Sequence, residues 1–170
     1  MNTLKINDIV TPFSTNDDYN EDERAVIQSA IGILANKLVN QDEAYHLTTT
    51  QASKDFLQLK IGTSSREIFA VLLLNNEHRV IAYEELSVGT VGAATVYPRE
   101  VAKLALTHNA SAMIIAHNHP SGTLESSNAD DAITQRIGIA CEMLDIRLLD
   151  HVIVSLRGTM SYNEQGKMPI

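Results

Sequence analysis

The chain has 170 residues, 44% of them hydrophobic and 20% charged, a composition typical of a globular protein with a sizeable core. Its net charge of −8 argues against direct nucleic-acid binding, and its single cysteine, Cys141, excludes an internal disulfide and any multi-cysteine zinc site. No apolar run approaches the roughly 20 residues of a membrane span and no secretory pattern opens the chain, so we expect a cytoplasmic protein without membrane contact.

Two helices are predicted in the first third of the chain. Asn20 and Glu23 have the spacing of a capping box, which predicts a helix that continues to about Val39. A second, shorter helix is predicted to begin at its cap Thr50 and to end near Gly62.

The middle of the chain predicts strands around one helix. Residues 66–89 contain two apolar runs separated by a short polar turn that begins at Asn75 and Asn76, which predicts a β-hairpin. Pro98 predicts the first turn of a helix, because proline lacks the amide hydrogen that this position does not need. Residues 111–116, SAMIIA, then predict a buried central strand.

The last part of the chain predicts one long helix and two strands. The helix starts at Ser127, and the strands cover residues 147–156 and 160–164 with a turn at Gly158. We expect the inner face of the helix to be formed by Ile133, Ile137, Ala140, Cys141 and Leu144. Strands and helices mix without strict β-α-β alternation, so the predicted fold class is α/β, a mixed β-sheet with flanking helices rather than a barrel.

Two histidines stand where the central strand ends. His117 and His119 are two residues apart, so their side chains would project in the same direction. Asp130 lies in the first turn of the next helix, from which its carboxylate can reach back toward them. Two imidazoles and a carboxylate form the protein ligand set of a catalytic zinc whose fourth position stays open. Ser127 and Asp130 alone would be only a capping box, but together with the histidines in one strand–turn–helix unit they favour a metal site.

The same residues carry a family resemblance. The pattern His117-x-His119, seven residues, Ser127-x-x-Asp130 resembles the signature of the JAMM (MPN+) metalloproteases. The wider runs PREVAKLALTHNASAMIIAHNHPSG and DHVIVS are similar to the RadC-type branch of that superfamily, over roughly residues 48–163.

This resemblance implies an MPN/JAB domain, whose architecture is like that of cytidine deaminases, over residues 48–170. Residues 1–47 would be a partly helical N-terminal extension. The chain departs from the RadC pattern at Ser126, where a proline usually precedes the serine. It also lacks the N-terminal helix-hairpin-helix module often joined to RadC proteins, which weakens the expectation of a DNA-related role.

The resemblance also implies a zinc-dependent metalloprotease or isopeptidase that hydrolyses an amide bond of a peptide or protein with a metal-activated water. His117, His119 and Asp130 would hold one zinc per chain. Ser127 would hydrogen-bond the developing oxyanion or the water on the metal. An upstream glutamate would accept a proton from that water and deliver it to the leaving amine.

Four glutamates are candidates for this proton transfer. Glu67, directly before the first apolar strand, matches the glutamate of the family and is favoured. Glu84 and Glu85, near the end of the partner strand, are the alternatives. Glu100 is better explained by the start of a helix, where a negative charge is stabilising.

Other polar residues have less specific interpretations. Asp150 and His151 could orient a ligand histidine or could satisfy buried backbone groups, and the sequence favours neither. Cys141, on an apolar helix face, is expected to be a core residue rather than a nucleophile. Surface or helix-end positions are expected for His46, His78 and His108.

Three other functions compete with the hydrolase. A zinc nucleobase deaminase needs His-x-Glu and Pro-Cys-x-x-Cys, which a chain with one cysteine does not contain. A non-catalytic interaction module of the MPN-like kind that lacks metal ligands is disfavoured because every ligand is present here, whereas a metal-binding interaction module with little catalytic activity stays an alternative. A RadC-type DNA-repair-associated protein would follow only from analogy between folds.

Overall fold

The computed structural model of the chain describes residues 19–39, 51–88 and 96–169. The elements are α2 (Glu21–Val39), α3 (Gln51–Ile61), β1 (Ile68–Leu74), β2 (Val80–Val88), α4 (Pro98–Thr107), β3 (Ala112–Asn118), α5 (Asn128–Glu142), β4 (Arg147–Ser155) and β5 (Gly158–Ser161). The five strands form one sheet in the order β2-β1-β3-β4-β5. Among the strand pairs that the structure describes, only β3 and β4 are parallel. The predicted α/β fold with a mixed sheet and flanking helices is therefore confirmed.

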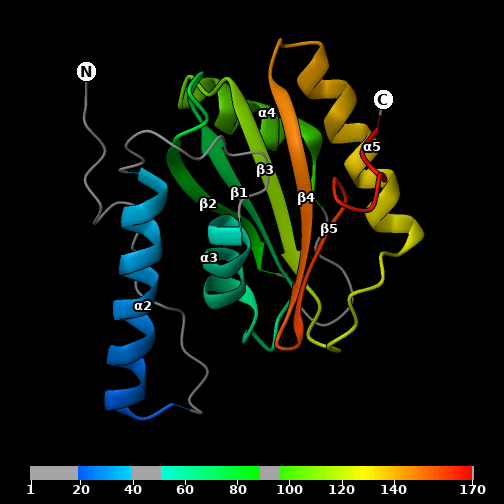
Figure 1. Cartoon of the computed structure of the whole chain (residues 1–170). Helices are drawn as coiled ribbons and strands as arrows, with labels where there is room; N and C mark the ends of the chain where they lie inside the picture. Colours follow the sequence, from blue (N-terminus) through cyan, green and yellow to red (C-terminus); the bar gives the residue numbers. More distant parts are fainter. Residues whose placement is uncertain (1–18, 40–50, 89–95, 170) are drawn as a thin grey trace.

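Helices cover both faces of this sheet (Figure 1). One core joins the sheet to α2 and α3, and a second core joins the other face to α4 and α5. Every residue of β1 and of the central strand β3 is buried. Side chains alternate between the two faces of a strand. Because Ile115 belongs to the second core, His117, two residues further on, projects to the face that α4 and α5 cover.

Local signals explain where the first helices begin. At the start of α2, Glu23 N–H donates to Asn20 Oδ1 at 3.0 Å and Asn20 N–H donates to Glu23 Oε2 at 2.9 Å, so the predicted capping box is present. Pro98 is the first residue of α4, as predicted. The predicted cap of α3, Thr50, lies outside the described residues.

Cys141 is a core residue, as expected. Its thiol is buried in α5, 3.7 Å from the sulfur of Met113 on β3. Burial raises the pKa of the Cys141 thiol to about 11, which keeps it protonated and unreactive at neutral pH.

The inner face of α5 was predicted wrongly at Leu144. The helix ends at Glu142, and the chain then turns through Asp145 with a positive φ of 55°. This turn leaves Leu144 37% exposed and buries Ile146 in its place. A polar residue of the same helix, Thr134, is only 1% exposed and was not predicted to be part of its inner face.

The last hairpin also differs from the prediction. Its turn is formed by the two residues before Gly158, and Gly158 itself begins β5 with a φ of 144°. The strand ends at Ser161 because the following backbone turns, with Lys167 N–H donating to the carbonyl of Tyr162 at 2.8 Å.

Two further expectations concern the whole chain. The boundary expected between residues 47 and 48 falls outside the described residues. Among the helices that the structure describes, none combines the length and the apolar character needed to cross a membrane.

Candidate metal centre

The three predicted ligands come together at the end of β3. His117 is the penultimate residue of the strand, His119 follows its last residue, and Asp130 is in the first turn of α5. His117 Nε2 lies 2.9 Å from His119 Nε2 and 3.1 Å from Asp130 Oδ1. His119 Nε2 lies 3.7 Å from Asp130 Oδ2. One ligand atom from each residue can be chosen so that all three lie within 4.8 Å of one another.

Donor type and spacing both fit zinc. Zinc bonds of 2.0–2.2 Å to nitrogen and oxygen in a tetrahedron put neighbouring ligand atoms about 3.3 Å apart. The separation of 2.9 Å between the two histidine nitrogens and the separations of 3.1 and 3.7 Å between these nitrogens and the Asp130 oxygens bracket that value. Two imidazoles and one carboxylate are also a known protein ligand set for a catalytic zinc.

Each histidine is oriented through its other ring nitrogen. His119 Nδ1 lies 3.2 Å from the carbonyl oxygen of Thr123, to which it can only donate. His117 Nδ1 lies 2.8 Å from Nε2 of His151. The ring of Phe69 stacks beside His117, with the two planes 10° apart. These contacts direct both Nε2 atoms toward Asp130, and two lone pairs beside a carboxylate need a cation or a proton between them.

Ser127 and Asp130 form the predicted capping box. Ser127 is the N-cap of α5, and its hydroxyl accepts from Asp130 N–H at 3.2 Å. The backbone N–H and the hydroxyl of Ser127 both donate to Asp130 Oδ2 at 2.7 Å. One carboxylate oxygen is therefore held by the helix start, while the other, Oδ1, faces His117.

The charges at the site are coupled. Burial works against ionisation of Asp130, but its contacts with the imidazoles of His117 and His119 outweigh it and hold the pKa of this carboxyl well below its usual range. The hydrogen bond to Asp130 raises the pKa of His119, against the opposing effect of burial, and the negative charge of Glu67 adds to the rise. The pocket thus favours positive charge beside a permanent carboxylate.

Glu67 lies on the same side as the histidines. The β1–β3 ladder pairs Phe69 with His117, and Glu67 precedes Phe69 by two residues. Its negative charge makes a small contribution to the raised pKa of His119, which is due mainly to Asp130. The structure therefore brings Glu67 toward the three ligands, although it is not itself a member of the cluster.

The other candidate glutamates have other partners. Tyr83 donates to Glu85 at 2.7 Å, and Tyr83 belongs to the core on the opposite face of the sheet from His117. Glu84 lies 3.4 Å from His108 at the end of α4. Glu100 is in the first turn of α4, where Arg99 lies 3.2 Å from it.

Asp150 and His151 have different roles. The carboxylate of Asp150 accepts from the backbone N–H of His151 at 2.8 Å and of Asn163 at 2.9 Å, and from the Ser161 hydroxyl at 2.6 Å. Asp150 therefore satisfies buried backbone. The ring of His151, by contrast, contacts the predicted ligand His117 directly. The backbone interpretation is therefore correct for Asp150, and the orienting role stays a prediction for His151.

Two further histidines, His78 and His108, lie away from this cluster. His108 caps the C-terminal end of α4, as expected, and pairs with Glu84. His78 has a positive φ of 60° in the β1–β2 turn and contacts the guanidinium of Arg147. His46 lies outside the described residues.

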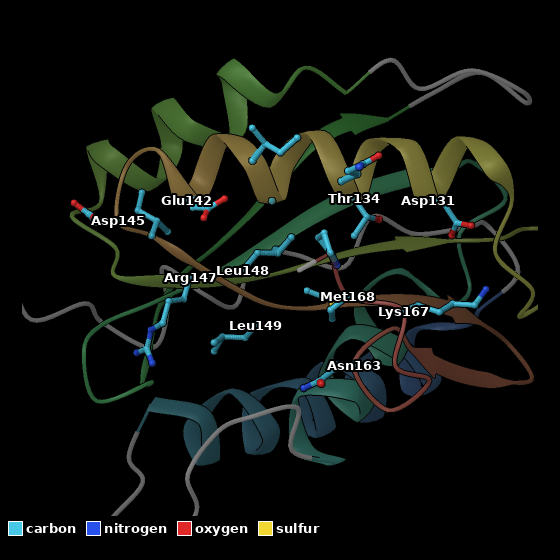
Figure 2. Close-up of a pocket in the computed structure, with 15 residues that line it drawn as sticks. Asp131, Thr134, Glu142, Asp145, Arg147, Leu148, Leu149, Asn163, Lys167 and Met168 are labelled. Carbon is cyan, nitrogen blue, oxygen red and sulfur yellow. The ribbon is translucent and has the colours of Figure 1, made fainter.

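Sequence reasoning missed Thr134. Its hydroxyl lies 2.5 Å from Nδ1 of His151, which links α5 to the histidine behind the ligands. Figure 2 shows Thr134 and Asp131 at the wall of a pocket between α5 and the C-terminal residues; none of the three ligands lines this pocket. The signal available was the spacing of Thr134 four residues after Asp130, which places both on one helical face.

Comparison with known proteins extends these observations. Residues 47–167 match the RadC-like JAB domain family. A relative in Aeromonas hydrophila, named UPF0758 protein, is 46% identical over 143 residues, 84% of this chain and 62% of the relative. A UPF0758 protein of Vibrio cholerae is 45% identical over 148 residues, 87% of this chain and 90% of the relative. The chain thus spans less than two thirds of the Aeromonas protein but most of the Vibrio protein.

Proposed function

The chain belongs to the RadC-like JAB domain family, and from that premise we propose that it is a zinc-dependent hydrolase of JAMM type that cleaves an amide bond in a peptide or protein. The observation that carries the proposal is the convergence of His117, His119 and Asp130 at the end of β3. These three residues would hold the zinc. The cytoplasm remains the expected compartment.

The residues around the zinc have separate tasks. When bound, zinc polarises a carbonyl oxygen and lowers the pKa of water to about 7. Glu67 accepts a proton from the water that attacks the carbonyl carbon, and it returns this proton to the nitrogen as the C–N bond breaks. Phe69, which is only 4% exposed, stacks beside His117 and helps to hold its ring in place.

Ser127, the N-cap of α5, positions the carboxylate of Asp130. Its hydroxyl and its N–H hold one oxygen of Asp130, which keeps the other oxygen directed at His117. A donation from Ser127 to the developing oxyanion would require the hydroxyl to release Asp130. We therefore propose that Ser127 acts first by positioning the carboxylate and second as an oxyanion donor.

The test is zinc content, measured by elemental analysis of untagged protein after zinc is offered and excess is removed. Wild type should hold about one zinc per chain. His119→Ala and Asp130→Asn should both lose it. Asparagine keeps an oxygen that can accept from Ser127, so Asp130→Asn preserves the capping box and removes only the charge and the second oxygen. Wild type that stays free of metal would contradict the proposal and favour an interaction module.

Activity is tested next, because a metal site alone does not make an enzyme. A peptide library and isopeptide-linked substrates should be cleaved by zinc-loaded wild type. They should not be cleaved by Glu67→Gln loaded with the same amount of zinc. Equal cleavage by both would remove Glu67 from the mechanism, and no cleavage by loaded wild type across the library would favour a metal-binding interaction module.

A further inference from the structure

A buried chain of hydrogen bonds connects two of the ligands from behind. His117 Nδ1 lies 2.8 Å from His151 Nε2, and His151 Nδ1 lies 2.5 Å from Thr134 Oγ1. The Thr134 hydroxyl donates to the backbone carbonyl of Asp130 at 2.5 Å. The His151 side chain is fully buried and Thr134 is 1% exposed, so no bulk water competes for these bonds.

The direction of these hydrogen bonds follows from the last acceptor in the series, the backbone carbonyl of Asp130. The Asp130 carbonyl has no hydrogen to give, so the single hydroxyl hydrogen of Thr134 is used there. Thr134 Oγ1 must then accept, which requires the hydrogen of a neutral His151 to be on Nδ1. His151 Nε2 becomes an acceptor, and the hydrogen of His117 must be on Nδ1.

A neutral His151 is consistent with its surroundings. Its two ring nitrogens contact His117 and Thr134, and none of its ring hydrogen bonds in the described part of the chain involves a carboxylate. The neighbouring Asp150 binds the backbone N–H of His151 and not its ring. The ring of Tyr162 stacks on His151 with centroids 4.7 Å apart and planes 20° apart, so the imidazole cannot easily turn.

We propose that Thr134 and His151 are positioning residues that set the tautomer of His117, so that the lone pair of Nε2 points to the metal position. The inference rests on the proposed zinc function of His117. It does not apply to His119, whose Nδ1 faces the carbonyl of Thr123 instead. The helix hydroxyl thereby links the two ligands His117 and Asp130, which come from different elements.

The decisive variant is Thr134→Val, which keeps the shape of the side chain and removes the hydroxyl. Without it, His151 Nδ1–H has no acceptor, and the reversed tautomer, with the hydrogen of His117 on Nε2, becomes competitive. Loss of a partner behind a ligand histidine commonly lowers metal affinity about 10- to 100-fold. Thr134→Ser keeps the hydroxyl and should bind zinc within about threefold of wild type.

The α4 helix offers a matched control. Thr107 also donates its hydroxyl to the carbonyl four residues before it, at 2.8 Å, but it lies away from the metal ligands. Thr107→Val therefore removes the same kind of hydrogen bond within a helix without changing the hydrogen bonds that connect His117, His151 and Thr134. Its zinc affinity should equal that of wild type.

The experiment titrates zinc alone into metal-free protein against a competing chelator, for wild type and the three variants. The ¹⁵N shifts of the imidazoles in the metal-free protein report which nitrogen of His117 carries hydrogen. We expect Nδ1–H in wild type and in Thr134→Ser, and a mixture in Thr134→Val. Similar thermal unfolding of metal-free Thr134→Val and Thr107→Val would exclude a general folding defect as the cause.

The outcomes separate this inference from the proposed function. Zinc affinity of Thr134→Val equal to that of wild type would overturn the positioning role and leave the zinc site intact. Hydrogen on Nε2 of His117 in metal-free wild type would overturn it too. If wild type binds no zinc, the proposed function fails, whereas the ¹⁵N spectra still test the tautomer.

Discussion

The side chain of Asn118 accepts a hydrogen bond from the backbone N–H of Ile68 at 2.7 Å, although the two residues are 50 positions apart. The same amide donates to the carbonyls of Ser64 at 3.2 Å and Arg66 at 3.0 Å. These three bonds hold the backbone on both sides of Glu67. Asn118 stands between His117 and His119, so one residue fixes the distance between the two proposed zinc ligands and the proposed proton acceptor Glu67.

We predict that Asn118→Ala destabilises the protein and lowers activity without removing zinc. The substitution leaves a buried N–H without a partner, which should lower the free energy of unfolding by about 1–3 kcal/mol. Urea unfolding measures the stability, and elemental analysis the zinc. Exposed Asn163 provides the control variant Asn163→Ala. A loss of zinc equal to that of His119→Ala would contradict a role confined to the Glu67 segment.

The position of Glu67 predicts that substitutions of Glu67 and Glu85 have different effects on the rate of hydrolysis. Glu67→Gln should lower the rate of amide hydrolysis about 10²- to 10⁴-fold, because a glutamine cannot accept the proton. Glu85→Gln should leave the rate unchanged, since Tyr83 and Glu85 interact on the other side of the sheet. Both variants should contain as much zinc as wild type. Rates measured at saturating zinc that rank the two variants in the reverse order would make Glu85 the base.

Zinc affinity should depend on pH even at pH values above the usual pKa of histidine. The hydrogen bond to Asp130 raises the pKa of His119, so in metal-free protein a proton occupies the site at a higher pH than at a free histidine. Zinc must displace this proton, and affinity should fall about tenfold per pH unit once the pH is below that raised value. Chelator competition between about pH 8.5 and pH 6 measures it, with ordinary histidine titrating near 6.5. A zinc affinity that does not change over this whole pH range would be inconsistent with the ion pair between His119 and Asp130.

The same pKa shift makes the metal-free protein more stable at low pH, where zinc binding is weak. A raised pKa means that the folded state binds the proton more tightly than the unfolded chain does. The His119–Asp130 pair therefore stabilises the metal-free protein fully below pH values near 6.5 and loses this contribution as the pH rises through the raised pKa. At higher pH a bound zinc ion would supply the positive charge that the proton no longer provides.

Much of the site could be predicted because its residues lie in one short segment. His117, His119, Ser127 and Asp130 fall within one strand–turn–helix unit, where alternation along a strand and the first turn of a helix determine direction. The choice between Glu67 and Glu85 could not be made this way. It depends on which face of the sheet each reaches, and a bulge between Phe69 and Ala70 shifts the β1–β2 register.

Contacts between segments that are distant in the chain could not be predicted from the sequence, for a related reason. Thr134 is an ordinary helix residue until β4 places His151 against it, and no local pattern marks that meeting. Leu144 was expected to be buried because it continues the apolar spacing of α5. The helix stops two residues earlier, however, and a positive φ at Asp145 redirects the chain.

The C-terminal segment gives a last prediction, through Tyr162. Its ring stacks on His151, and its hydroxyl donates to Asp131 in the first turn of α5 at 2.7 Å. Tyr162→Phe keeps the ring and removes the hydroxyl with its hydrogen bond to Asp131, and it should lower the free energy of unfolding by about 1 kcal/mol with no change in zinc affinity. Tyr162→Ala also removes the ring, which should cost about 3–5 kcal/mol and weaken zinc binding because the imidazole of His151 is then free to turn.

Urea unfolding and chelator competition on the two Tyr162 variants separate these effects. Because the Phe variant keeps the stacking, a loss of zinc affinity in it would mean that the hydroxyl, and thus the anchoring of α5 through Asp131, controls the site. Normal zinc affinity in a folded Ala variant would mean that His117 and Thr134 hold His151 in place without the ring. Weakened binding in the Ala variant alone would show that the residues after β5 hold the metal centre through His151, although none of them is a ligand.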